Sequence, residues 1–124
     1  MSSKNRISAF REERERLNEV ALAEGGLAIR RFFNLDTAAY KEGALDSRVK
    51  ELIGLAASLV LRCDDCILYH TLRAFEEGVT DEEYREVMNI GLVVGGSIVI
   101  PHLRRAFEHW QELKREKEKR NGQE

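Results

Sequence analysis

Helical periodicity is the sequence feature that most limits what this chain can fold into. Apolar residues recur at intervals of three and four along most of the chain, and no stretch of useful length alternates apolar with polar residues as a strand would. The length of 124 residues matches one ordinary domain. The sequence therefore predicts a single all-α domain over residues 1–124, with about six helices and a core within 27–110 between charged helical ends.

The first half of the chain is expected to hold two helical regions and a buried helix. An amphipathic helix should run from about 5 to 24 and end at Gly25 and Gly26. Residues 27–43 favour a short helix or two, whose expected core side chains are Phe32, Phe33, Leu35 and Tyr40. Residues 47–61 are apolar around most of the helix circumference, which predicts a buried central helix through Val49, Leu52, Ile53, Leu55, Ala56, Leu59 and Val60.

Caps and glycines mark the helices that follow. One helix should begin near Cys63 or Asp64, where acidic residues suit a helix start, and end at Gly78. Thr80 begins a capping-box sequence, which starts the next helix at about Asp81.

The last helix follows a strongly apolar segment. Residues 90–100 are apolar on nearly every side, and a chain of this length would struggle to cover them alone, which predicts a homo-oligomer. Pro101 should kink the last helix or lie in its first turn. That helix then passes into a charged tail over 114–124, and its expected apolar face is Leu103, Phe107, Trp110 and Leu113.

Composition and charge exclude several classes of protein. The chain is 43% hydrophobic and 34% charged, too apolar for disorder and too charged for a membrane protein. Its longest apolar run, 90–101, is well short of the roughly 20 residues that a membrane-spanning helix needs. The formal charge of −2 is spread without a basic stripe for nucleic acid, and the N-terminus has no apolar signal-peptide core. We therefore expect a soluble cytoplasmic protein that binds neither nucleic acid nor membranes.

Three residues with chemically reactive side chains share one helical stripe. Cys63, Cys66 and His70 stand at positions i, i+3 and i+7, so their side chains point to the same side of a helix. A thiol at a helix N-terminus has a lowered pKa, because the backbone N–H groups and the helix dipole stabilise the thiolate. His70 follows Cys66 by one turn and can take its proton. This pattern predicts a nucleophile with its base.

Glu51 is a single carboxylate within the predicted buried helix. In one unbroken helix it would lie about 18 Å from Cys63, at the usual rise per residue. It can join the site only if the chain turns near Arg62, which would bring the carboxylate to His70 and fix the tautomer of the imidazole. Such a turn would also account for a buried charge that is costly without a partner.

The spacing of these four residues resembles a known family signature. Glu51, the pair Cys63-Asp64-Asp65-Cys66 and His70 look like the Glu, Cys-x-x-Cys, x-x-x-His pattern of the alkylhydroperoxidase D-like branch of the carboxymuconolactone decarboxylase family. The resemblance extends over roughly 27–110. It implies an all-helical fold with helices packed across subunits, in rings that are commonly hexamers or trimers.

The resemblance also implies a thiol-dependent peroxidase that needs no bound cofactor. Cys66 would attack a hydroperoxide and become a sulfenic acid, and Cys63 would condense with it to a disulfide. An external dithiol, on a lipoyl-bearing or thioredoxin-like protein, would then reduce the pair. The helix-dipole argument alone would instead favour Cys63 as the more activated thiol.

This sequence departs from alkylhydroperoxidase D between the two cysteines. That enzyme has a histidine there, whereas this chain has Asp64 and Asp65, and nearby carboxylates disfavour a thiolate. The chain is also shorter than alkylhydroperoxidase D, which duplicates the helical unit. The sequence thus leaves room for a slower peroxidase or for a dithiol–disulfide exchanger.

Four other readings remain open at the level of sequence. The cysteines could be inert core residues. They could bind zinc together with His70 and a fourth ligand drawn from Glu51, His102 or His109. They could sense oxidants in a non-catalytic helical module. The family's namesake reaction, decarboxylation of a cyclic lactone acid, is the fourth, although that branch does not depend on a cysteine pair.

His102 and His109 share one face of the predicted last helix, because they are seven residues apart. Surface or interface packing is the interpretation that we adopt for both.

Overall fold

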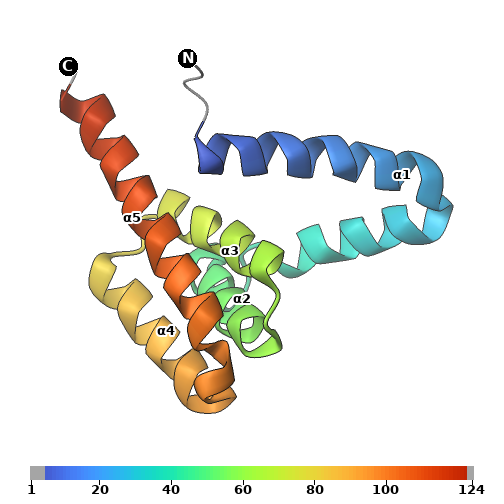
Figure 1. The fold of residues 1–124 in the computed structure, drawn as a ribbon. Coiled ribbons are helices and arrows are strands. Elements are labelled where there is room, and N and C mark those ends of the chain that lie inside the picture. Colours follow the sequence, from blue (N-terminus) through green and yellow to red (C-terminus); the bar gives the residue numbers. More distant parts are fainter. Residues whose placement is uncertain (1–4, 123–124) are drawn as a thin grey trace. The chain divides into compact units, whose positions relative to one another are not determined.

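The computed structural model describes residues 5–122, and every regular element in that range is helical (Figure 1). This confirms the all-α prediction. The elements are α1 (Arg6–Ala39), α2 (Ser47–Leu61), α3 (Asp64–Glu76), α4 (Asp81–Gly95), the 3-10 helix η1 (Ser97–Val99) and α5 (Ile100–Gly122). Within the described range, no helix combines the length and the apolar character needed to cross a membrane. The chain divides into two compact units, Met1–Lys41 and Glu42–Glu124.

The first unit consists of α1, which is broken at the predicted place. The side chain of Asn5 caps its start by accepting a hydrogen bond from the Ser8 N–H at 2.8 Å. Gly26 has φ 71° and ψ −153°, a conformation open to glycine and outside the helical region, so α1 is two helical segments that meet at this residue. The predicted break at Gly25 and Gly26 is therefore confirmed.

The core prediction for the second segment of α1 is wrong at two positions. Phe32 and Leu35 are each 65% exposed, while Phe33 and Tyr40 are half-buried. An apolar helix face shows that burial there would be favourable, but the covering element need not belong to the same chain. The helix also ends at Ala39, earlier than the Gly43 expected from sequence.

The second unit is built around α2. Leu55 and Leu59 on its inner face are completely buried, and α2 packs against both α3 and α4. The close approach of α4 depends on Gly91, where an added Cβ would lie 2.7 Å from a methyl carbon of Leu59. The predicted burial of α2 thus holds on this face but is wrong for Ile53, which is 54% exposed.

The starts of α4 and α5 follow the sequence signals. The Thr80 hydroxyl accepts the Glu83 N–H at 3.1 Å, and the Glu83 carboxylate accepts the Thr80 N–H at 2.9 Å, which confirms the capping box. Pro101 lies in the first turn of α5. Trp110 of α5 is buried and stacks on Tyr84 of α4, with ring centroids 4.1 Å apart. The helix continues through the charged tail as far as Gly122.

Candidate active site

The turn between α2 and α3 has the geometry that the candidate site requires. Arg62 ends α2 in the left-handed region, with φ 60° and ψ 42°. Its N–H donates to the carbonyl of Leu59, and the N–H of Cys63 donates to the carbonyl of Ser58. These bonds satisfy the last carbonyls of α2 and reverse the chain within two residues. The turn expected near Arg62 is confirmed.

The two cysteines lie at the start of α3 and form a disulfide. Cys63 is the N-cap residue, its Cα is 5.2 Å from that of Cys66, and its sulfur accepts the Cys66 N–H at 3.2 Å. Cys63 is half-buried, whereas Cys66 is exposed. Two sulfurs at a helix start are therefore within bonding reach of each other and open to solvent, which is not the environment of inert core thiols.

Glu51 and His70 form a buried pair between α2 and α3. They are 3% and 8% exposed, and Oε1 of Glu51 lies 2.8 Å from Nδ1 of His70. A carboxylate oxygen can only accept, so the proton of this bond belongs to Nδ1. The bond leaves Nε2 as the basic nitrogen of a neutral His70, one helical turn after Cys66. The structure thus brings together the four residues that the sequence singled out, as two neighbouring pairs.

Arg73 adds a cation that sequence reasoning missed. Its Nε lies 3.6 Å from Oε2 of Glu51, and its other nitrogens bind Glu76 at 2.6 Å and Glu77 at 3.2 Å. The hydrogen bond to Glu76 raises the pKa of Arg73, and the charge of Glu51 adds to the effect. Arg73 follows His70 by three residues, so helical spacing was the available signal.

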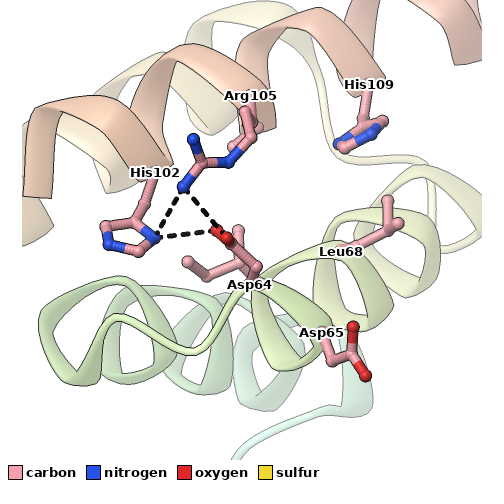
Figure 2. Close-up of a pocket in the computed structure, with 8 residues that line it drawn as sticks. Asp64, Asp65, Leu68, His102, Arg105 and His109 are labelled. Atoms are coloured by element: carbon pink, nitrogen blue, oxygen red, sulfur yellow. Dashed lines mark hydrogen bonds and ion pairs between the residues drawn. The ribbon is translucent and has the colours of Figure 1, made fainter.

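Asp64 binds two residues of α5 (Figure 2). Its Oδ1 lies 2.8 Å from Nδ1 of His102, and its Oδ2 accepts a hydrogen bond from Nη2 of Arg105 at 2.9 Å. Burial opposes ionisation, but the bonds from His102 and Arg105 outweigh it and lower the pKa of Asp64. No sequence signal indicated this contact, because it joins residues about forty positions apart.

A small hollow between α3 and α5 adjoins this cluster. His102 and His109 both line it, which confirms that they share one face of the last helix. The remaining lining includes Asp65 and the buried Leu68 (Figure 2).

The zinc alternative finds no support in the arrangement of side chains. Among residues 5–122, no three or more His, Cys, Asp or Glu side chains are grouped so as to hold a metal ion.

Comparison with known sequences gives one family. The model of the carboxymuconolactone decarboxylase family matches residues 26–109. An uncharacterized protein of Cupriavidus necator is 33% identical over 104 residues, which cover 79% of this chain and 92% of that protein. Uncharacterized protein 4 in the cox locus of Paracoccus denitrificans is 30% identical over 82 residues, 66% of this chain and 74% of its own length.

Solved structures agree with this match. One crystal structure of a Thermotoga maritima protein has a TM-score of 0.88 at 56% identity, covering 90% of this chain and 97% of that chain. Another crystal structure of that protein, with a TM-score of 0.85 at 54% identity, covers 94% and 97%, and describes it as a carboxymuconolactone decarboxylase family protein "possibly involved in antioxidative response". A family member from Legionella pneumophila has a TM-score of 0.79 at 27% identity, covering 88% and 97%.

Proposed function

Because the chain belongs to the carboxymuconolactone decarboxylase family, we propose that it is a peroxidase of the alkylhydroperoxidase D-like type. The observation that carries the proposal is the disulfide at the start of α3, open to solvent at Cys66 and backed by the buried pair of Glu51 and His70. The antioxidative role attributed to the Thermotoga maritima relative supports the same reading.

The first half of the proposed cycle oxidises Cys66. Nε2 of His70 takes the thiol proton, and Glu51 stabilises the imidazolium that results. The thiolate attacks the terminal oxygen of a hydroperoxide, the O–O bond breaks, and the alkoxide leaves as an alcohol with the proton that His70 returns. Cys66 is left as a sulfenic acid.

The second half forms and then reduces the disulfide. The sulfur of Cys63 attacks that of Cys66, the sulfenic oxygen leaves as water, and the disulfide seen in the structure results. An external dithiol on a lipoyl-bearing or thioredoxin-like protein then reduces it by two thiol–disulfide exchanges and is itself oxidised to a disulfide. No bound cofactor takes part.

The order of attack follows from exposure and spacing. Cys66 is the more exposed cysteine and lies one turn before His70, which suits the attacking thiol. Cys63 is half-buried, which suits the resolving thiol, and the Cys66 N–H that its sulfur accepts stabilises the thiolate with which it attacks the sulfenic acid. We place the protein in the cytoplasm, where a reducing environment regenerates such a pair.

We also propose that the chain works as a homo-oligomer, a hexamer or a trimer. The support is a group of exposed apolar side chains on α4 and η1, each at least 58% exposed in the single chain: Ile90, Val93, Val94 and Ile98.

Peroxide consumption with dihydrolipoamide as reductant tests the catalytic proposal. We expect turnover by the wild type, none above background by Cys66→Ser, and a sulfenic acid trapped on Cys66 by dimedone in Cys63→Ser. Peroxide should lower the mass of the reduced wild type by about two daltons, as a disulfide requires. Equal consumption by wild type and Cys66→Ser would refute the proposal, and turnover of a muconolactone-type acid in its place would identify a decarboxylase.

A further inference from the structure

We propose that Arg105, with His102 beside it, is a positioning residue for the thiol chemistry, because it cancels the charge of Asp64, the residue that follows Cys63. The inference rests on the proposed function and extends it to α5. It explains how this chain keeps a reactive thiol although an aspartate follows Cys63 directly.

The contact between α3 and α5 involves both oxygens of the Asp64 carboxylate. Nδ1 of His102 lies 2.8 Å from Oδ1 of Asp64, and Nη2 of Arg105 lies 2.9 Å from Oδ2 (Figure 2). His102 and Arg105 are three residues apart on α5, so they present both nitrogens from one helix face. Asp64 lies in the first turn of α3 and stands between Cys63 and Cys66 in the sequence. Arg105 therefore supplies the positive charge of this contact, and His102 binds the other oxygen of the same carboxylate.

Asp65, the other acidic residue between the cysteines, can be compared with Asp64. It occupies the same helical turn as Asp64, yet within residues 5–122 it makes no ion pair, and in Figure 2 its carboxylate points away from His102 and Arg105. Only one of the two acidic residues between the cysteines is thus compensated.

The electrostatic argument depends on the sign of each neighbour. A carboxylate close to a thiol raises the pKa of the thiol, whereas the start of a helix lowers it. Asp64 stays ionised, since its bonds to α5 lower its pKa, so only a cation can cancel its effect. The charged and titratable groups of this region are Arg62 in the turn, Asp64, Asp65 and His70 on α3, Glu51 on α2, and His102, Arg105 and His109 on α5.

The test measures thiol reactivity rather than turnover. In reduced Cys63→Ser protein, where Cys66 is the single thiol, the rate of alkylation by iodoacetamide against pH gives the thiol pKa. Arg105→Gln should raise this pKa by about half to one unit and slow alkylation at pH 7 about three- to tenfold. Arg105→Lys should restore most of the rate, and Arg104→Gln, which changes the exposed neighbouring arginine, should leave it unchanged.

The Asp64→Asn variant distinguishes an effect of charge on the thiol from an effect of anchoring α3 to α5. Asp64→Asn and Arg105→Gln both remove the ion pair and weaken the contact, so a purely structural role would shift the alkylation rate in the same direction in both. The proposal instead requires opposite shifts, with Asp64→Asn about three- to tenfold faster and the double variant close to the parent.

Salt supplies a second readout. Asp64 and Arg105 are 51% and 49% exposed, so raising the ionic strength from about 0.05 to 0.5 M should shrink the difference between Arg105→Gln and its parent. An unchanged thiol pKa in Arg105→Gln, or shifts of the same sign in the two single variants, would overturn the inference. Because alkylation needs no peroxide, this result is independent of whether the wild type proves to be a peroxidase.

Discussion

Glu51 is a carboxylate in a position where burial of a charge is ordinarily costly. It is 3% exposed, and it meets His70 at 2.8 Å and Arg73 at 3.6 Å. Removing a charge from water costs several kcal/mol unless partners compensate it, and this cost rises as the site becomes less accessible to solvent. A charge kept at that cost is a common mark of a functional site, since apolar residues of the same size would serve stability as well.

Glu51→Gln should therefore reduce catalysis far more than it disturbs the fold. The amide keeps the size of the side chain but cannot stabilise an imidazolium, so we expect peroxide turnover to fall about 10²-fold or more. His70→Asn should do the same. Steady-state rates with circular dichroism spectra check both, and His109→Asn, a histidine of α5 outside the buried pair, is the matched control. Wild-type turnover by His70→Asn would rule out the proton relay.

The sequence predicted those parts of the site that depend on local spacing. Cys66 and His70 lie one turn apart within α3 and Cys63 is its N-cap residue, so their arrangement follows from the local geometry of the helix start. Arg105 could not be predicted, because its contact with Asp64 depends on how α5 crosses α3. Such contacts between distant helices are set by packing, which single-sequence periodicity does not encode.

At the scale of elements, the short turn after α2 determines which residues meet. Arg62 adopts the left-handed conformation and lets α3 start at once, so α3 packs back along α2. Glu51, well before the turn, then lies opposite His70, well after it. The left-handed position costs a non-glycine residue about 1 kcal/mol, which the bonds across the turn offset.

The start of α4 is held to α5 by Asp81, and this contact should depend on pH. Its carboxylate accepts the Trp110 indole N–H at 2.6 Å and binds Lys114 at 3.1 Å. The hydrogen bond from Trp110, followed by that from Lys114, lowers the pKa of Asp81. A carboxyl whose pKa is lower in the folded state stabilises the fold above its unfolded pKa of about 3.9, and that contribution is lost as pH falls through the folded value.

Asp81→Asn should therefore flatten the acid side of the stability profile. Urea unfolding followed by Trp110 fluorescence should show a smaller fall in midpoint between pH 7 and about pH 3 for the variant than for the wild type. Asp36→Asn, at an exposed aspartate of α1, is the control and should retain the wild-type slope. Parallel profiles for Asp81→Asn and wild type would show that this carboxylate does not couple folding to pH.

The ends of the helices were easier to predict from sequence than the faces that the helices bury. The capping box at Thr80 and the break at Gly26 depend on a few neighbouring residues, and both were confirmed. Phe32, Leu35 and Ile53 were predicted to be buried but are exposed. Apolar periodicity gives the face of a helix that prefers burial, whereas the covering surface depends on tertiary or quaternary packing.

At the scale of the whole molecule, the single chain leaves much apolar surface open to water. In the second unit this includes large side chains on α2, α4 and η1, all of them more than half exposed: Ile53, Leu61, Ile90, Val93, Val94 and Ile98. Monomeric proteins seldom expose contiguous apolar patches of more than a few hundred Å². Val93, at 82%, is the most exposed of the group and gives the sharpest probe of the proposed assembly.

Val93→Asp should weaken the assembly without unfolding the chain, because the side chain makes little contact within the monomer. Light scattering after size exclusion should give a wild-type mass at a multiple of 14.3 kDa and a smaller particle for the variant. Burying an uncompensated carboxylate at each contact costs several kcal/mol, so dissociation should shift by at least about two orders of magnitude in concentration. Gln111→Asp, on an exposed face of α5, should keep the wild-type mass. A wild-type mass of one chain at all concentrations would mean that α4 has no partner in solution, and the exposed valines would then need another explanation.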